Sequence, residues 1–511
     1  MDEAASKMSL TAEKSPFSLS RLPEVFVSSK AIASAVSKAV NTGRLRKIGS
    51  RLYTKNLTEP ADQIVRRNWH ALLKDYFPDA LISDRTALEN RPATDGSVFI
   101  ISSGTREVKL PGITFKPRKG PPPLDSDAPF LGGLRLSSSP RAWLENMRRT
   151  RVRGSSIART LSRVELEERL DGLLRQGGGE ALNRLRDDAR NISQQLGTAA
   201  EIQLLDELIG TFLGTREAKL ASPAALARKR GLPYDPDRLE IFQLLFAELR
   251  SQAPVMRPAS PVVGSARTNL AFFESYFSNY IEGTEFQVEE AMDIVFHGVI
   301  PRERPADAHD VLGTHRVVSD YEGMSRTPRD FAELLALLKE RHAAFMELRP
   351  DKLPGEFKLK GNRAGSTFFV APELVLGTLA RGFEFYRGLE PPLHRAIFMM
   401  FLVSEVHPFA DGNGRAARIM MNAELVKAAE QKIIIPTIFR NDYFTALKAL
   451  SQSGNPSPLV RALTFAQKYT ASIPWGNLEA ARAELRGTNA FMDATEAENS
   501  GIRLTLPQNT A

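Results

Sequence analysis

Apolar residues in the C-terminal half of the chain recur at the spacing of amphipathic helices. One set fills a single stretch at intervals of one, three and four residues: Phe272, Phe273, Tyr276, Phe277, Tyr280 and Ile281. The same period recurs in Phe331–Phe345, Pro372–Tyr386 and Pro392–Val406. Because residues three and four apart share a helix face, these stretches predict helices with one buried side.

A different pattern interrupts the helical stretches. Pro354–Leu359 and Thr367–Pro372 flank the segment Gly361–Gly365. Two short runs on either side of a glycine-bounded turn predict a β-hairpin.

One segment of the N-terminal half has a clear pattern. Helical apolar spacing covers Ala31–Val40, follows serines that can cap a helix, and ends at the turn Asn41–Gly43. In the next segment, Arg44–Lys55, the candidate anchors of a hairpin are Leu45, Ile48, Leu52 and Tyr53. A helix, a glycine turn and a hairpin with basic exposed positions together predict a winged helix.

These patterns predict a multidomain fold. We expect a mainly α domain with a β-hairpin, preceded by an α/β N-terminal region that contains a winged helix. The expected parts are a disordered tail (1–20), a winged-helix-like region (21–130), a helical connecting region (131–250), the mainly α domain (262–480) with a distinct helix at 271–283, and a flexible tail (486–511). A linker is expected around Pro254, Pro258 and Pro261.

Composition narrows the class of protein. The 511 residues are 42% hydrophobic and 25% charged, as in soluble globular proteins of two or more domains. The absence of cysteine excludes disulfides, thiolate metal sites and thiol catalysis, and it fits a cytoplasmic protein. The start of the chain lacks the apolar core of a signal peptide, and the longest apolar run, Ala396–Val403, falls short of the ~20 residues of a membrane helix. The net charge of +8 permits a nucleic-acid partner without requiring one.

The densest group of chemistry-bearing residues is His407–Arg418. Gly412 and Gly414 can adopt backbone angles closed to other residues, so Gly-Asn-Gly can form a concave nest of N–H donors. The apolar stretch Ile419–Val426 predicts a helix directly after it. A nest at a helix N-terminus favours an anion.

Charged residues around this nest suit a polyphosphate. Arg415 and Arg418 are three apart, share a helix face, and can each bind phosphate oxygens. Asp411 offers the oxygen ligands that Mg²⁺ takes beside substrate phosphates. His407 precedes the nest and titrates near neutrality, which suits a general base.

The arrangement resembles the Fic signature, H-x-F-x-[DE]-G-N-G-R-x-x-R, at every specified position. Fic enzymes are mostly nucleotidyltransferases that move AMP from ATP onto a Ser, Thr or Tyr hydroxyl of a target protein. The resemblance implies that His407 deprotonates the hydroxyl, Asp411 holds Mg²⁺, and Phe409 locks the loop into the core. The loop of the related Doc-type branch, which phosphorylates its target, lacks this Gly-Asn-Gly with paired arginines.

The same resemblance assigns the phosphate contacts. Gly412, Asn413 and Gly414 would form the anion hole, with the Asn413 side chain on the α-phosphate. Arg415 would hold the β-phosphate and Arg418 the γ-phosphate.

A second motif, Ser278 to Gly283, fits the Fic inhibitory pattern [ST]-x-x-x-E-[GN]. In the family, Glu282 would pair with Arg418 and deny it to the γ-phosphate, while Ser278 supports the same surface and Gly283 ends the helix. The alternative is an ordinary helix end with a solvated glutamate. In some inhibited Fic proteins the equivalent carboxylate activates water and removes AMP from the target, so de-AMPylation is a second candidate reaction.

The predicted hairpin corresponds to the flap that clamps the target in Fic proteins. An exposed strand edge can pair with a target backbone, with Phe357 and Phe368 as candidate contacts. The alternative is a plain surface hairpin. Downstream, Tyr443 is a candidate for the nucleotide-base pocket or for the core of its helix.

The N-terminal part resembles the AbiEi-like antitoxin and defence-regulator family in two short stretches, Gly43–Thr54 and Arg159–Leu170. The resemblance implies a recognition helix around Ala33–Lys38 in the major groove of DNA. The candidate phosphate contacts are Arg44, Arg46, Lys47 and Arg51. The alternative is a winged fold that serves protein contacts or dimerisation.

Two functions follow from these resemblances. The first is a cytoplasmic, auto-inhibited Fic protein adenylyltransferase that uses ATP and Mg²⁺ and acts on a protein with a Ser, Thr or Tyr hydroxyl. The second is a DNA-binding transcriptional regulator, or toxin–antitoxin-type protein, whose Fic half senses ATP or modifies itself. Duplex DNA and a second copy of the chain, as a homodimer, are further candidate partners; a membrane is not.

Overall fold

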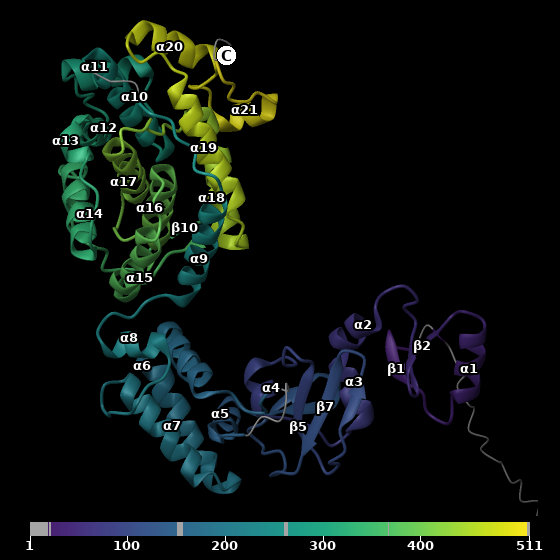
Figure 1. Cartoon of the computed structure of the whole chain (residues 1–511). Coiled ribbons are helices and arrows are strands. Elements are labelled where there is room, and N and C mark those ends of the chain that lie inside the picture. Colours follow the sequence, from purple (N-terminus) through teal and green to yellow (C-terminus); the bar gives the residue numbers. More distant parts are fainter. Residues whose placement is uncertain (1–18, 20–21, 151–156, 260–263, 366, 508–511) are drawn as a thin grey trace, which may run out of the picture. The chain divides into compact units, whose positions relative to one another are not determined.

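The structure, a computed structural model, describes residues 19, 22–150, 157–259, 264–365 and 367–507. The chain divides into two compact units, Met1–Lys229 and Arg230–Ala511 (Figure 1). The first unit contains both helices and sheets, and the second is almost entirely helical with one short hairpin. The predicted multidomain fold, with an α/β region before a helical domain, is therefore confirmed. Apart from Leu19, the expected tail at 1–20 lies outside the described residues.

The first unit alternates short strands and helices before ending in helices. Its elements are β1 (Val25–Val27), α1 (Ala33–Asn41), β2 (Arg46–Gly49), β3 (Leu52–Thr54), α2 (Ala61–Arg67), α3 (Trp69–Tyr76), β4 (Leu81–Ile82), α4 (Asp84–Glu89), β5 (Ser97–Ile101), β6 (Val108–Leu110), β7 (Ile113–Arg118), β8 (Ala128–Phe130), β9 (Leu134–Leu136), α5 (Ser139–Met147), α6 (Arg163–Leu196), α7 (Ala199–Phe212) and α8 (Pro223–Lys229).

Two sheets organise this unit. A three-stranded antiparallel sheet has the order β1-β3-β2, and a six-stranded mixed sheet has the order β6-β7-β5-β4-β9-β8. The central strand β5 is buried along its whole length, pairing in parallel with β7 and antiparallel with β4. Since β9 completes this sheet beside β4, the expected boundary at residue 130 falls within a sheet. Long-range pairing of this kind leaves no local signal in the sequence.

A helix followed by a hairpin forms the start of the first unit, as the apolar pattern predicted. Val36 and Leu45 are buried with Phe26 in a small cluster of their own. The candidate DNA contacts Arg44, Lys47 and Arg51 are exposed, whereas Arg46 is partly buried and donates to the carbonyl oxygen of Glu59. The winged-helix assignment itself stays a prediction.

The second unit is built around two antiparallel central helices. Its elements are α9 (Pro236–Ser251), α10 (Ser265–Ile281), α11 (Val288–His297), α12 (Pro305–Ser319), α13 (Tyr321–Met324), α14 (Phe331–Phe345), β10 (Arg363–Ala364), β11 (Thr367–Phe368), α15 (Val375–Arg387), α16 (Pro392–Val406), α17 (Asn413–Lys427), α18 (Arg440–Ser453), α19 (Ser457–Ala471), α20 (Leu478–Gly487) and α21 (Ala494–Ser500).

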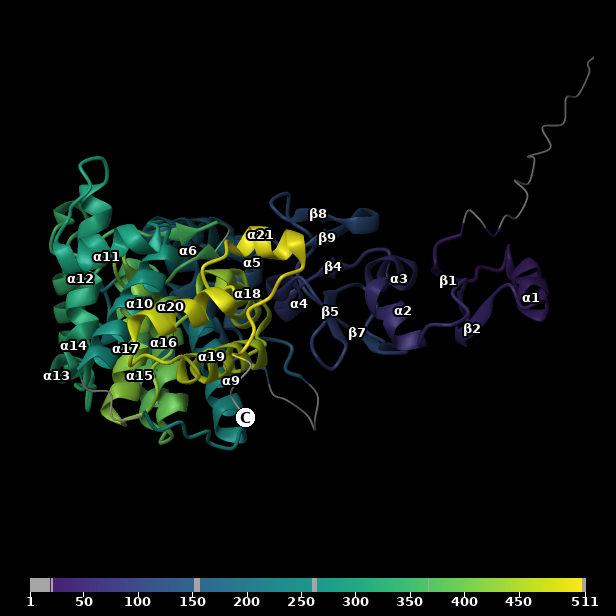
Figure 2. The same ribbon diagram turned by 90° about the horizontal axis from the view of Figure 1, so that it is seen from above.

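Helices α16 and α17 lie in the middle of the unit in both ribbon views (Figures 1 and 2). Helices α10, α13 and α14 pack on α17, and α9, α15 and α19 pack on α16. Nearly every side chain of α16 and α17 is buried. The segment joining them is therefore held from both ends by the core of the unit.

Helix α9 belongs to this second unit, although we expected a connecting region up to residue 250. Phe242 is fully buried and its ring packs against Phe398 and Phe401 of α16. The proline-containing segment after α9 is not a free linker at Pro258, which forms a β-bridge with Glu430. The apolar side chains of α9 pack on the core of the second unit, so this helix belongs to that unit although the sequence after it resembles a linker.

The expected flexible tail from residue 486 is also different in the structure. After α20, the chain continues into α21, and Phe491 stacks on Phe277 of α10 with ring centroids 5.4 Å apart. Leu504 and Leu506 pack on the same cluster. The segment is polar overall, so the sequence pattern did not indicate that its few apolar residues pack on the core.

A buried ion pair joins α10 to the end of the core. The Lys432 ammonium lies 2.7 Å from Glu274 and donates to the Val318 carbonyl at 3.1 Å. Asn422 of α17 donates to the other Glu274 oxygen at 2.8 Å. Both charged side chains are almost inaccessible, and such a pair needs both partners to offset the desolvation of its charges.

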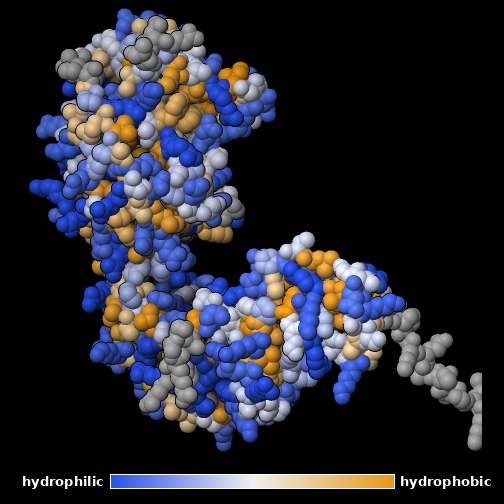
Figure 3. Space-filling model, turned by 45° about the vertical axis from the view of Figure 1, so that its right-hand side comes forward, coloured by the Kyte–Doolittle hydropathy of each residue, from blue (hydrophilic) through white to orange (hydrophobic). Residues whose placement is uncertain are grey.

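Hydrophilic side chains cover most of the surface that is visible in Figure 3, with apolar ones gathered in smaller groups between them. In the described part of the chain, no helix has the length and apolarity that crossing a membrane requires.

Replacing Lys432 alone should destabilise the second unit strongly. The variant Lys432→Met leaves the Glu274 carboxylate buried without its cation, at a cost of about 3–5 kcal/mol in the free energy of unfolding. Amide hydrogen exchange of α10 and α17 measures this free energy. Adding Glu274→Gln should recover much of the loss, and equal destabilisation in the single and double variants would contradict the pairing.

Candidate active site between helices α10, α16, α17 and α18

A tight loop connects the two central helices. His407 ends α16 in the left-handed conformation, with φ of 53°, and Pro408 prevents the helix from continuing. Gly412, with φ of 73°, is the N-cap of α17, and this backbone angle favours glycine. Phe409 is fully buried between these two ends. The loop therefore presents His407 and the N-terminus of α17 on neighbouring sides of one turn.

The Asn413 side chain holds this loop together. Its Oδ1 accepts the N–H of Phe409 at 2.8 Å, and its Nδ2 donates to the Phe409 carbonyl at 2.9 Å. With 1% of its surface exposed, the side chain is committed to the loop. The expected contact of this side chain with an α-phosphate is therefore not prepared here, because both ends of the amide already have partners.

Arg418 is buried against the end of α10. Its Nε donates to Ser278 Oγ at 3.0 Å, and its Nη2 donates to the Ser278 carbonyl at 2.8 Å and to Glu282 at 2.7 Å. Burial alone would lower the pKa of Arg418, but the nearby Glu282 raises it on balance, so the guanidinium is charged. The predicted pairing of Glu282 with Arg418 is thus present as geometry.

Glycines next to both partners allow Glu282 to approach Arg418 closely. A Cβ on Gly414 would lie 2.1 Å from Glu282 Oε1, so in this position the carboxylate occupies the space that a side chain at residue 414 would need. Gly283, with φ of 92°, turns the chain away directly after Glu282. Arg440 donates to the Ile281 carbonyl at 3.0 Å and so caps α10 at the same end.

Arg415 faces α10 as well but lies deeper. It contacts Asn279 Oδ1 at 3.3 Å and Asp310 at 3.4 Å, and its guanidinium lies over the Phe345 ring. With 4% of its surface exposed, it does not line the cavity described next. The expected β-phosphate contact of Arg415 is therefore not prepared in this conformation, because its acceptors come from the core.

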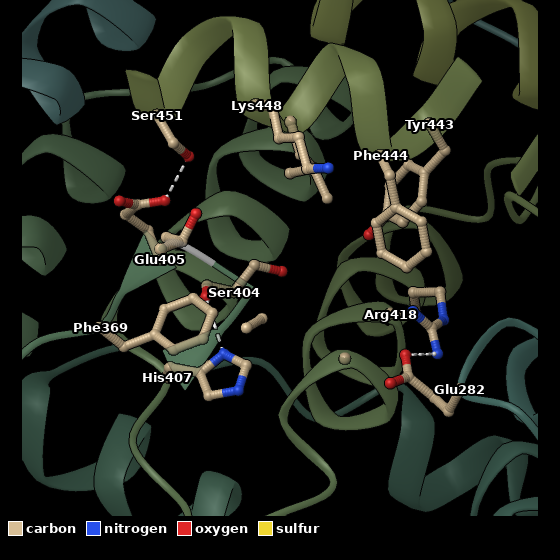
Figure 4. A pocket seen from close by; sticks show the side chains of 14 residues that line it. Glu282, Phe369, Ser404, Glu405, His407, Arg418, Tyr443, Phe444, Lys448 and Ser451 are labelled. Atoms are coloured by element: carbon tan, nitrogen blue, oxygen red, sulfur yellow. Dashed lines mark hydrogen bonds and ion pairs between the residues drawn. The ribbon is translucent and has the colours of Figure 1, made fainter. Parts of the chain in front are cut away.

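A cavity of about 290 Å³ opens beside the loop. Figure 4 shows His407 and Phe369 on one side of it, and the Arg418–Glu282 pair with Tyr443 and Phe444 of α18 on the other; Lys448 of the same helix also lines it. The cavity thus combines an imidazole, a guanidinium, a carboxylate and the N-terminus of α17, which are the groups that a phosphoryl or nucleotidyl transfer uses. Tyr443 is itself almost fully buried in its wall.

His407 is held in one orientation. Its Nδ1 lies 3.1 Å from the Ser404 carbonyl, to which it can only donate, so Nε2 is the unprotonated nitrogen. Phe369 lies flat against the imidazole, with centroids 3.6 Å apart and planes at 5°. Burial lowers the pKa of His407 to about 4, so the ring is neutral at pH 7 and Nε2 can accept a proton.

A second imidazole supports the loop from the opposite side. His342 of α14 is completely buried; the Gly355 N–H donates to its Nδ1 at 2.9 Å, and its Nε2 lies 3.0 Å from the Asp411 carbonyl. Burial lowers the pKa of His342 to about 4, so this ring is also neutral. Nothing in its helical surroundings in the sequence distinguishes it from an ordinary core histidine.

The hairpin differs from the prediction in its extent. Only Arg363–Ala364 and Thr367–Phe368 pair as β10 and β11. Phe357 instead forms a bridge with Phe409 and is half-buried, because its ring packs on the loop with centroids 5.4 Å apart. Phe368 is 69% exposed on the hairpin, as expected of a residue that contacts a partner, whereas Phe357 is not available for that role.

The sequence did not predict the residues at the far end of the cavity. Glu405 is buried in its wall, receives a hydrogen bond from Ser451 at 2.5 Å, and pairs with Arg238 of α9 at 2.5 Å. Arg238 also donates to the Phe368 carbonyl at 2.6 Å, which ties the hairpin to α9. These residues lie far apart in the chain, so no local pattern connects them.

The central part of this unit is similar to known proteins. Residues 332–425 match the model of the Fic/DOC family. A protein adenylyltransferase Fic of Drosophila persimilis is 34% identical over 229 residues, 44% of each chain. The corresponding protein of Drosophila mojavensis is 24% identical over 231 residues, which are 44% of this chain and 45% of that protein, and fic-1 of Caenorhabditis briggsae is 26% identical over 196 residues, 37% and 38% of the two chains. The chain thus spans less than half the length of these relatives.

Two solved structures align with parts of this chain. Residues 134–508 of Fic-1 from C. elegans align with 63% of this chain and 96% of that one, at 17% identity and a TM-score of 0.34. A Fic domain-containing signaling protein from Bacteroides thetaiotaomicron aligns over 48% and 97%, at 17% identity and a TM-score of 0.36. Likenesses at these low scores say nothing about function.

The neutrality of His407 can be measured directly. NMR titration of the histidine rings should give His407 a pKa of about 4, below its ordinary value of 6.5. Phe369→Ala should raise this pKa, since water then reaches the imidazole. Phe368→Ala, which removes the exposed neighbour, is the matched control and should leave it unchanged. A pKa near 6.5 in the unaltered protein would contradict the desolvated environment.

Proposed function

We propose that this Fic-domain protein is a protein adenylyltransferase, which transfers AMP from ATP to a hydroxyl side chain of a target protein. The observation that carries the proposal is one cavity lined by a neutral His407 with a free Nε2, by Arg418 and by Gly414 at the helix N-terminus. The relatives named protein adenylyltransferase Fic support it.

The chemistry follows from the positions of these groups. The target hydroxyl gives its proton to His407 Nε2 as its oxygen bonds to the α-phosphorus of ATP. The bond from that phosphorus to the bridging oxygen breaks, and pyrophosphate leaves. Charge that develops on the α-phosphate oxygens would meet the first N–H groups of α17, including the backbone of Asn413 and Gly414, which need no reorganisation.

A magnesium ion that arrives with ATP would fit beside Asp411. This residue is exposed on the loop, and its carboxylate is fixed by the Gly412 N–H at 2.7 Å. Among the described residues there is no group of three or more His, Cys, Asp or Glu side chains that could hold a metal. The protein would thus supply one carboxylate and the phosphates further oxygens, which is usual for Mg²⁺. The ion would neutralise phosphate charge in the transition state.

We further propose that Glu282 inhibits this reaction. The Nε and Nη2 donors of Arg418 are bound to Ser278 and Glu282, so they are not available to a γ-phosphate. The carboxylate also stands against Gly414, close to the helix N-terminus where phosphate oxygens would lie, and like charges repel there. The same carboxylate could take a proton from water and so remove AMP from the target, which is the second candidate reaction of this site.

A second function, DNA binding by the first unit, has one observation in its favour. Arg44 and Lys47 of the hairpin region and Lys38 of α1 all have exposed side chains. A duplex-binding regulator with a Fic half that senses ATP or modifies itself would use such cations on phosphates. A cytoplasmic location and a homodimer stay predictions.

Relief of inhibition tests the enzyme assignment. Purified Glu282→Gly protein, given α-labelled ATP, Mg²⁺ and a cell lysate, should label a target or itself at least about tenfold more than the unaltered protein, since Arg418 is freed to bind phosphate. Adding Arg418→Ala should remove the gain.

Two further variants act as controls. His407→Ala in the Glu282→Gly background should abolish transfer with little change in ATP affinity, because the base acts on the hydroxyl and not on the phosphates. Asp442→Gly, which changes an exposed carboxylate outside the cavity, should not increase labelling. Equal activity of the Glu282→Gly and unaltered proteins would refute the inhibitory role.

DNA binding should be visible as a salt-dependent affinity. A fluorescence-anisotropy titration of the whole chain with duplex DNA should lose affinity as salt rises, with a log–log slope of about 0.9 for each phosphate contact. The triple variant Arg44→Ala, Lys47→Ala, Arg51→Ala should weaken binding to all sequences alike. Lys109→Ala, an exposed lysine of the same unit, is the control. No binding at micromolar protein would leave protein contact as the role of this module.

A further inference from the structure

His342 links the loop between α16 and α17, here called the catalytic loop, to Gly355 in the segment that leads into the hairpin. A backbone N–H can only donate, so the Gly355 N–H at 2.9 Å requires an unprotonated Nδ1. The proton of the neutral ring is then on Nε2, which donates to the Asp411 carbonyl at 3.0 Å. Two backbone groups, on two different segments, thus define one tautomer of this imidazole.

The ring also forms part of the surface on which the loop rests. It lies flat on Phe409, with centroids 3.7 Å apart and planes at 2°. A Cβ on Gly412 would come within 3.3 Å of His342 Nε2 and within 3.0 Å of the Phe345 ring. The loop therefore turns into α17 directly over the imidazole, and its path depends on the position of the ring.

The other bond of His342 fixes the beginning of the hairpin segment. Gly355 sits against α14, where a Cβ would lie 3.1 Å from Ala343, and its φ is 77°. From there the chain runs along the loop: Lys358 donates to the Pro408 carbonyl at 2.9 Å, and Asn362 donates to the Phe409 carbonyl at 2.9 Å. The hairpin that carries Phe369 to His407 starts from the residue that His342 holds.

We propose that His342 is a positioning residue for both substrates of the transfer reaction. The proposal rests on the proposed function. The Nε2–H bond to Asp411 sets the loop and the N-terminus of α17, and thereby the nucleotide half of the site. The Nδ1 bond to Gly355 sets the hairpin, and thereby the target half. His342, which contacts neither substrate, would thereby fix the position of the nucleotide half of the site relative to the target half.

Amide substitutions can separate the two bonds. In His342→Gln the side-chain nitrogen can take the place of Nε2 and keep the bond to Asp411. In His342→Asn the side-chain oxygen can take the place of Nδ1 and keep the bond to Gly355. His342→Phe keeps the flat contact with Phe409 and loses both bonds, so it controls for packing.

In the Glu282→Gly background, each His342 variant should change a different set of kinetic parameters. His342→Asn should lower kcat about tenfold and weaken ATP binding, with the KM for the target nearly unchanged. His342→Gln should raise the KM for the target about tenfold, with kcat nearly unchanged, and His342→Phe should show both effects; a factor of ten is what loss of one buried hydrogen bond typically causes. A role limited to stability would lower the active fraction, and so the apparent kcat, in all three variants without changing ATP affinity or the KM for the target. That result, or wild-type kinetics in His342→Phe, would overturn the proposal.

Hydrogen exchange and nucleotide binding test the same idea without any transfer. The Gly355 amide should stay protected in His342→Asn and exchange faster in His342→Gln, and a fluorescent ATP analogue should bind more weakly to His342→Asn than to His342→Gln. If Glu282→Gly protein transfers no AMP, the proposed enzyme function fails, while these two measurements still decide on His342. Equal Gly355 protection in the Asn and Gln variants would contradict the assignment.

Discussion

A buried guanidinium needs hydrogen-bond acceptors, and this requirement ties helix α10 to helix α17. Arg415 and Arg418 are both nearly inaccessible near the start of α17, and the end of α10 supplies acceptors to each of them. Helix α10 is therefore part of the core rather than an appendage. Its inner face serves the two arginines, and its outer face lies in an aromatic cluster. The site and the stability of the unit depend on the same contacts.

Two neutral imidazoles, one on each side of the loop, give the site its rigidity. His407 and His342 each stack flat on a phenylalanine and each bond to backbone atoms, without a carboxylate partner. A carboxylate partner would stabilise the charged form of a histidine, whereas a carbonyl and an aromatic face keep it neutral. The loop is thus prepared before a substrate arrives, which is how fixed dipoles contribute most to a reaction.

The sequence predicts the parts of this site that are local. The pattern from His407 to Arg418 locates a loop, a helix start and the residue types, and the spacing of apolar residues locates the helices around it. The orientation of Arg415 could not be predicted, because its acceptors lie on α10 and α12. The same holds for His342, whose partners Gly355 and Asp411 are brought together only by the fold. Likewise, the hairpin is shorter than predicted because burial of Phe357 on the loop outweighs its strand pairing.

Part of the cover of α10 is synthesised after the helices of the core. Its aromatic face contacts Trp475 and Phe491, which leave the ribosome only after the whole catalytic loop has been made. Since chains fold from their N-terminal end during synthesis, the part of α10 that packs on these two residues has no cover until they have been made. A chain that stops before Trp475, by truncation or stalling, would contain every residue of the catalytic loop. Part of the aromatic face of α10 would then be exposed and prone to aggregation. Synthesis beyond Phe491 is therefore a condition for a fully covered α10.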